Sequence, residues 1–185
     1  MINADIKSSN HNDYTIDEDI INLIYDFAYS ISIHHVICSR CKDSYNPNNV
    51  QELFWHTISA NCLQQGVSDW CKVFGAARER TNYTRIHALF VNDFERAIEG
   101  ENINYLEYSK AMRNFRDKFI AHRDSFEKRE KIPYLDQALK ICDLFEKMVI
   151  SEKYGIPPYG RLLDYYEKSK LRIEEYLDAI GLHEI

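Results

Sequence analysis

Apolar side chains recur along most of this chain at three- and four-residue steps, the period of an α-helix with one buried face. The clearest example is 102–122, where Tyr108, Met112, Phe115 and Phe119 form a continuous stripe that His122 extends. Similar patterns predict helices over 15–40, 50–65, 83–99, 133–153 and 161–180, with a short one around Trp70. No stretch alternates as a half-buried strand does, so the sequence predicts an all-α fold.

Turn-forming residues separate the predicted helices. Thr15 with Glu18 three residues later forms a capping-box pattern, while Gly66, Gly75 and Gly100 are expected helix ends. The DSYNPNN and GIPPYG segments are expected to be non-helical. We therefore expect a single-domain helical bundle of about six to seven helices, built mainly from antiparallel neighbours.

The predicted domain spans 14–185, after a disordered N-terminal tail over 1–13. Within it, 154–160 is expected to be a loop leading to a C-terminal docking helix. The polar N-terminus is unlike a signal peptide, and we expect no apolar segment long enough to span a bilayer. The prediction is a soluble, cytoplasmic protein without membrane association.

Charge is unevenly distributed. The formal net charge at pH 7 is −6, which argues against a surface that binds nucleic acid everywhere. Residues 110–124 differ, because five basic side chains there face two acidic ones, a local charge of +3 that leaves −9 elsewhere. These residues are Lys110, Arg113, Arg116, Lys118 and Arg123, with Asp117 and Asp124. Any RNA contact is therefore expected at this patch.

Metal or disulfide chemistry has little support. The five cysteines are an odd number in a chain without a secretory signal, so reduced thiols are expected. Cys38 and Cys41 form a CxxC, which suits a zinc site or, preferably, two ordinary thiols on one helix side. A metal hydrolase would need ligands such as His34, His35 and His56, but no HExxH or HD-type cluster accompanies them. We predict neither a metal nor another cofactor.

Arg116 and His122 are the residues best suited to chemistry. A guanidinium matches phosphate oxygens, and an imidazole exchanges protons near neutral pH. Six residues of helix separate them by about 9 Å of rise and about 120° of rotation, so they lie on different faces. Twofold packing of two chains would bring both pairs into one groove. The alternative is that His122 completes the core and bonds a backbone carbonyl.

This arginine and histidine near the end of a long helix, in the phrase RDKFIAHRD, resemble the R-x4-6-H motif of the HEPN superfamily. With WCKVFG at 70–75, the chain is similar to the abortive-infection U-type HEPN-like branch. The resemblance implies a HEPN-like fold and a homodimeric, metal-independent endoribonuclease with its active site at the dimer interface. It also implies a toxin or phage-defence role, with an antitoxin or other regulator as partner.

The resemblance assigns catalysis to Arg116 and His122, with Asp117 orienting one of them or joining a side-chain network. Cleavage would leave 2′,3′-cyclic phosphate ends. Arg113, Lys118 and Arg123 are candidates for contact with the RNA backbone, although solvated helix charges would look the same. The competing hypothesis is a non-catalytic dimerisation or protein-interaction module that retains the fold.

Overall fold

Helices make up nearly all the regular structure of the described residues, as predicted, and no strand occurs among them. The computed structural model describes 11–41, 48–86, 88–121, 132–151 and 159–182, with backbone alone at 11–17, 88–90 and 119–121. The helices are α1 (His11–Arg40), α2 (Val50–Phe74), α3 (Ala88–Gly100), α4 (Tyr105–Ala121), α5 (Leu135–Phe145) and α7 (Leu162–Ala179). A 3-10 turn, η1 (Tyr83–Arg85), precedes α3, and a π-helical turn, η2 (Glu146–Ile150), follows α5. The all-α, single-domain fold is thus confirmed.

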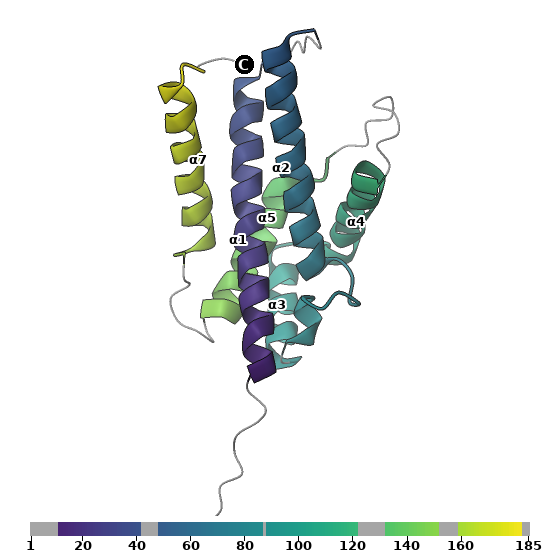
Figure 1. Ribbon diagram of the computed structural model, residues 1–185. Coiled ribbons are helices and arrows are strands. Elements are labelled where there is room, and N and C mark those ends of the chain that lie inside the picture. The colour runs from purple at the N-terminus through teal and green to yellow at the C-terminus, as the bar shows by residue number, and fades with distance from the viewer. Residues whose placement is uncertain (1–10, 42–47, 87, 122–131, 152–158, 183–185) are drawn as a thin grey trace, which may run out of the picture.

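The two longest helices, α1 and α2, form the centre of the bundle. They run side by side in opposite directions, with α7 beside α1 and α4 beside α2 (Figure 1). The apolar stripe of α1, which includes Ile24, Phe27 and Ile31, is completely buried. Burial of this stripe on neighbouring helices explains why α1 is stable at its full length.

Aromatic side chains join the second half of α2 to the rest of the core. Phe74 lies with its ring centroid 5.2 Å from Trp70, 5.9 Å from Phe94 and 5.4 Å from Phe145. Tyr83 packs edge-on against Phe94 at 5.3 Å. These rings bring α2, η1, α3 and α5 together, and tilted or edge-on pairs of this kind are the favoured aromatic arrangements.

The predicted helix end at Gly66 is wrong, because α2 continues from Val50 to Phe74. A Cβ added at Gly66 would lie 2.9 Å from Ile31 Cδ1 and 3.2 Å from Ile31 Cγ1. Glycine here therefore allows α1 and α2 to approach closely. Asp69, which precedes Trp70 in the segment predicted as a separate short helix, accepts hydrogen bonds from Gln65 and Lys72 within α2.

Other helix ends differ from the predictions by smaller amounts. α1 begins at His11, so Thr15 is inside the helix and not its cap. The helix predicted over 83–99 divides into η1 and α3, and α4 begins at Tyr105 after Asn102, whose φ is 56°. The predicted tail boundary at 13 falls inside α1, which begins at His11, whereas 1–10 and 154–158 lie outside the described residues, so the disordered tail over 1–10 and the loop stay predictions.

The C-terminal helix is docked on its own chain. Tyr25 donates a hydrogen bond to the Gly160 carbonyl, and Arg40 of α1 pairs with Asp178 at 2.7 Å. Between these contacts, His35 Nδ1 lies 2.6 Å from the Tyr166 hydroxyl. These contacts pack α7 on α1 of its own chain, and the docking role expected of this helix stays a prediction.

One helix bears on membrane association. Residues Glu18–Arg40 of α1 are long and apolar enough to cross a bilayer, which corrects the expectation that the chain contains no such segment. However, 67% of the most apolar window is buried inside the bundle, as in the core helix of a soluble protein. The cytoplasmic location stays a prediction.

Candidate functional site

The C-terminal half of α4 carries the described part of the predicted site. Met112 and Phe115 are buried against the core, which fixes the rotation of α4 about its axis. At its start, α4 is held to the end of α2, because Tyr105 and Ser109 both donate hydrogen bonds to the Phe74 carbonyl, at 2.7 Å and 3.0 Å. The same contacts place the basic residues of α4 beside α2.

Arg116 and Asp117 form an ion pair. Arg116 donates from Nε to Asp117 Oδ1 at 2.8 Å, and its NH2 atom lies 2.7 Å from the same oxygen. The Arg116 side chain is 21% exposed, whereas that of Asp117 is 63% exposed. Partial burial alone would lower the pKa of Arg116, but the bond to Asp117 and nearby negative groups raise it overall. The guanidinium is thus a permanent, oriented cation that solvent can reach.

Arg113 and Arg116 lie close enough to Cys71 of α2 for their charges to act on its pKa. Burial raises the pKa of the Cys71 thiol to about 12, and the charges that act on it include Arg116, Asp117, Arg113 and Glu79. Arg113 also donates from Nε to the Ser109 carbonyl at 3.3 Å. This edge between α2 and α4 therefore combines two guanidinium groups with two carboxylates and a thiol that stays protonated at neutral pH.

Not every predicted site residue is described. Lys118 is exposed on α4, one residue beyond Asp117. The description of α4 ends at Ala121, so His122 and Arg123, both predicted site residues, lie outside the described residues. The structure thus brings Arg116, Asp117 and Arg113 to one edge, and the position of the histidine relative to them stays a prediction.

The histidines considered as metal ligands have other partners. His34 is buried, and its Nδ1 lies 2.8 Å from Ser59 Oγ. Burial, followed by the proximity of His35, lowers the pKa of His34 to about 4, so the ring is neutral at pH 7. Cys38 Sγ lies 3.4 Å from Ser59 Oγ and 3.7 Å from His34 Nδ1. Across the described ranges, no three His, Cys, Asp or Glu side chains are arranged to hold a metal ion.

The sequence interpretation missed the Ser59–His34–Cys38 cluster. The spacing between His34 and Cys38 places them one turn apart on α1, but Ser59 comes from α2. The histidine and serine are 25 residues apart, so no local motif connects them. The one available signal was that His34 and Ser59 are polar residues on otherwise apolar helix faces.

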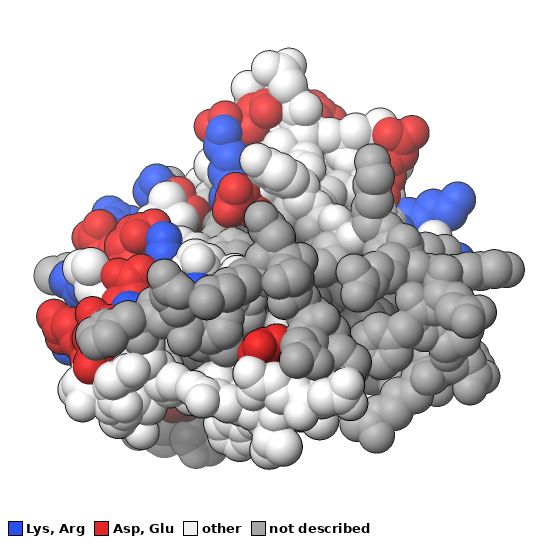
Figure 2. Space-filling model, turned by 90° about the horizontal axis from the view of Figure 1, so that it is seen from above, with Lys and Arg blue, Asp and Glu red and all other residues white. Residues whose placement is uncertain are grey.

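Surface charge is mixed near the ends of α1 and α7. Figure 2 shows Asp and Glu interspersed with Lys and Arg on the visible, described part of this face. α4 itself carries four basic and two acidic side chains between Tyr105 and Ala121. A polyanion would therefore find its favourable charge on α4 and not on this end of the molecule.

The described residues define a class, a single-domain all-α bundle with an oriented arginine on an edge helix. Comparisons with protein-family models, with curated proteins and with solved structures find no match. The resemblance to HEPN proteins therefore rests on the residues that carry the motif.

Proposed function

We propose that this chain is a metal-independent endoribonuclease of the HEPN type, with its active site at the interface of a homodimer. The observation that carries the proposal is Arg116, a partly exposed cation on α4 that Asp117 holds in one orientation six residues before His122. Orientation matters because a donor positioned in advance stabilises the transition state without reorganisation. The proposed cellular role is that of a toxin or phage-defence effector in the cytoplasm.

The proposed reaction requires one acid–base group and one cation. His122 or its twofold mate removes the proton from a ribose 2′-hydroxyl, whose oxygen attacks phosphorus. The bond from phosphorus to the 5′-oxygen breaks, the leaving oxygen takes a proton, and a 2′,3′-cyclic phosphate remains. Arg116 neutralises the charge that develops on the phosphoryl oxygens. Arg113, Lys118 and Arg123 are proposed to contact neighbouring phosphates.

A homodimer is proposed because α4 has a second face beside the one that packs on α2. The side chains of this face are exposed and follow one another at helical spacing, so another helix could pack along it. It comprises Glu107, Lys110, Ala111, Asn114, Asp117 and Lys118. Twofold packing there would bring two copies of Arg116 and His122 near one groove.

The second candidate is a non-catalytic dimerisation or protein-interaction module. The observation favouring it is that Arg116 already has an intramolecular partner in Asp117. Such a pair can stabilise the local structure of a surface without taking part in catalysis. The −9 charge outside 110–124 would then suit a basic protein partner.

The test is cleavage of total RNA by purified protein in excess EDTA. Wild type is compared with Arg116→Ala and His122→Ala, and with Arg96→Ala as the matched control. Arg96 is an exposed arginine on α3 that pairs with Asp93 at 3.2 Å. We expect both motif variants to lose at least about a hundredfold in rate, the order of effect for a lost charge-stabilising or acid–base group. Arg96→Ala should retain wild-type activity.

The readout includes the product ends and the oligomeric state. Fragments should resist phosphatase until acid opens the cyclic phosphate, and light scattering should give a dimer for every variant. Cleavage abolished by EDTA would contradict the proposed mechanism. Absence of cleavage by a folded wild-type dimer would instead favour the interaction module.

A further inference from the structure

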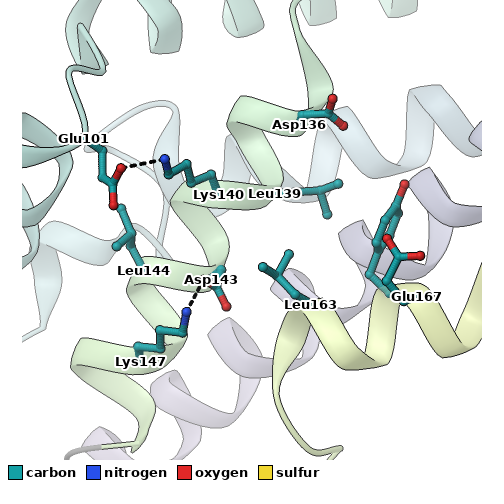
Figure 3. Close-up of a pocket in the computed structure, with 10 residues that line it drawn as sticks. Glu101, Asp136, Leu139, Lys140, Asp143, Leu144, Lys147, Leu163 and Glu167 are labelled. Atoms are coloured by element: carbon teal, nitrogen blue, oxygen red, sulfur yellow. Dashed lines mark hydrogen bonds and ion pairs between the residues drawn. The ribbon is translucent and has the colours of Figure 1, made fainter.

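A groove lies between α5 and α7, away from the α2–α4 edge (Figure 3). Its volume is about 520 Å³, enough for a small organic molecule or a long side chain. Leu139 and Leu144 of α5 and Leu163 and Tyr166 of α7 give it apolar walls. These walls suit the aliphatic part of a ligand.

The charged groups around the groove leave it negative. Four carboxylates and two ammonium groups line it, a net charge of −2. They are Glu101, Asp136, Asp143 and Glu167, with Lys140 and Lys147. Both lysines are neutralised, because Lys140 pairs with Glu101 at 2.5 Å and Lys147 with Asp143 at 2.6 Å. Lys170 of α7 in turn pairs with Glu167 at 3.4 Å, which brings the net charge to −1. The groove is therefore suited to a cation and unsuited to an anion.

Asp143 supplies an unused hydrogen-bond acceptor. The residue is 5% exposed, and its Oδ2 accepts the bond from Lys147. Its Oδ1 is buried and has no hydrogen-bond partner in the structure. Figure 3 shows Asp143 on α5 and Leu163 on α7 at facing sides of the groove. A buried carboxylate oxygen without a hydrogen-bond donor destabilises the folded chain, and a donor on a bound ligand would remove that destabilisation.

We propose that this groove binds an organic cation, a guanidinium or primary ammonium group on an aliphatic stem, and that the Asp143 side chain turns so that Oδ1 accepts a hydrogen bond from the N–H of that cation. The stem lies between Leu139, Leu163 and Tyr166, while Asp136 at the rim attracts the charge. A metal ion is a poorer occupant, since the described residues contain no set of three ligating side chains arranged around one point. The proposal is independent of the proposed nuclease activity.

The test is isothermal titration calorimetry of the full chain with three probes: agmatine, putrescine and a blocked Gly-Arg-Gly tripeptide. Asp143→Asn removes the charge of the acceptor with little change in shape. Leu163→Trp obstructs the groove at a residue that is 40% exposed and so tolerates a larger side chain. Asp164→Asn is the matched control, because it removes one exposed carboxylate from α7 outside the groove lining. Circular dichroism confirms that each variant is folded.

We expect at least one probe to bind wild type, and its Kd to rise at least about tenfold in Asp143→Asn and in Leu163→Trp. Asp164→Asn should stay within about twofold of wild type, since an exposed charge outside the groove is screened. Agmatine or putrescine binding would indicate a free amine as the ligand, whereas binding of the tripeptide alone would indicate a partner's basic side chain. The proposal is overturned if no probe binds, if folded Leu163→Trp binds as wild type does, or if Asp164→Asn weakens binding as much as Asp143→Asn.

Discussion

The close approach of α1 and α2 at Gly66 leads to a prediction about an added methyl group. In an isolated helix, Gly66→Ala would stabilise by about 1 kcal/mol. Here the new Cβ would lie 2.9 Å from Ile31 Cδ1, whereas carbon atoms in contact prefer about 3.5–4.0 Å. Ile31 is completely buried, so it cannot turn toward solvent, and overpacking of this kind costs about 1–3 kcal/mol. We expect a net loss of about 1 kcal/mol in the free energy of unfolding.

A double-mutant cycle in urea denaturation isolates this contact. Ile31→Val deletes Cδ1 and should alone lower the free energy of unfolding by about 1 kcal/mol. In the double variant, the methyl group of the new alanine at position 66 fills the space that Cδ1 vacated. The two changes should therefore couple favourably by about 1 kcal/mol. Gly100→Ala is the control, because its Cβ would meet nothing within 4 Å and should be neutral to stabilising. If Gly66→Ala stabilises as Gly100→Ala does, or the cycle shows no coupling, the steric explanation of the glycine is refuted.

Three further predictions concern the core, a buried histidine and the thiols. Phe74→Ala should lower the free energy of unfolding by about 3–5 kcal/mol in chemical denaturation, because Phe74 is buried among aromatic rings. The same change at Phe54, which is 55% exposed, should lower it by under about 1 kcal/mol. Equal losses would contradict the core assignment. The pKa of His34 is about 4 in the folded chain against an ordinary 6.5, so the unfolded chain binds more protons in this window and stability should fall by up to about 3 kcal/mol as pH drops from 7 to 4. His34→Gln should flatten that part of the stability curve, and an unchanged slope would assign the effect to other groups. Exposed Cys38 should react rapidly with Ellman's reagent, whereas buried Cys71, whose pKa is about 12, should react only on unfolding, as mass mapping of the labelled thiols would show.

Much of the secondary structure could be predicted from spacing alone. α7 matches its predicted range to within a residue or two, and the stripe of Tyr108, Met112 and Phe115 on α4 is buried as expected. Such patterns are local, because burial on one side of a helix imposes a period of 3.6 residues regardless of which helix supplies the neighbour. The helix ends were less predictable, since the Thr15 capping pattern and Gly66 both occur inside helices.

The candidate site, like the helices, could be predicted only in part from the sequence. The basic residues of α4 and the neighbouring Asp117 are visible in the sequence because they are consecutive or one turn apart. The proximity of Arg116 and Asp117 to Cys71 required the packing of α4 on α2. The sequence predicted the residue types and the helix that carries them, but not what they contact.

By itself, the sequence determined the all-helical class and most helix positions, since both follow from interactions within a few turns. The tertiary structure alone decided that Gly66 lies within a continuous α2, that His34 meets Ser59, and that Asp143 faces a groove beside α7 with an unused oxygen. Each of these features joins segments distant in the chain, and the energy of such contacts depends on how the helices pack.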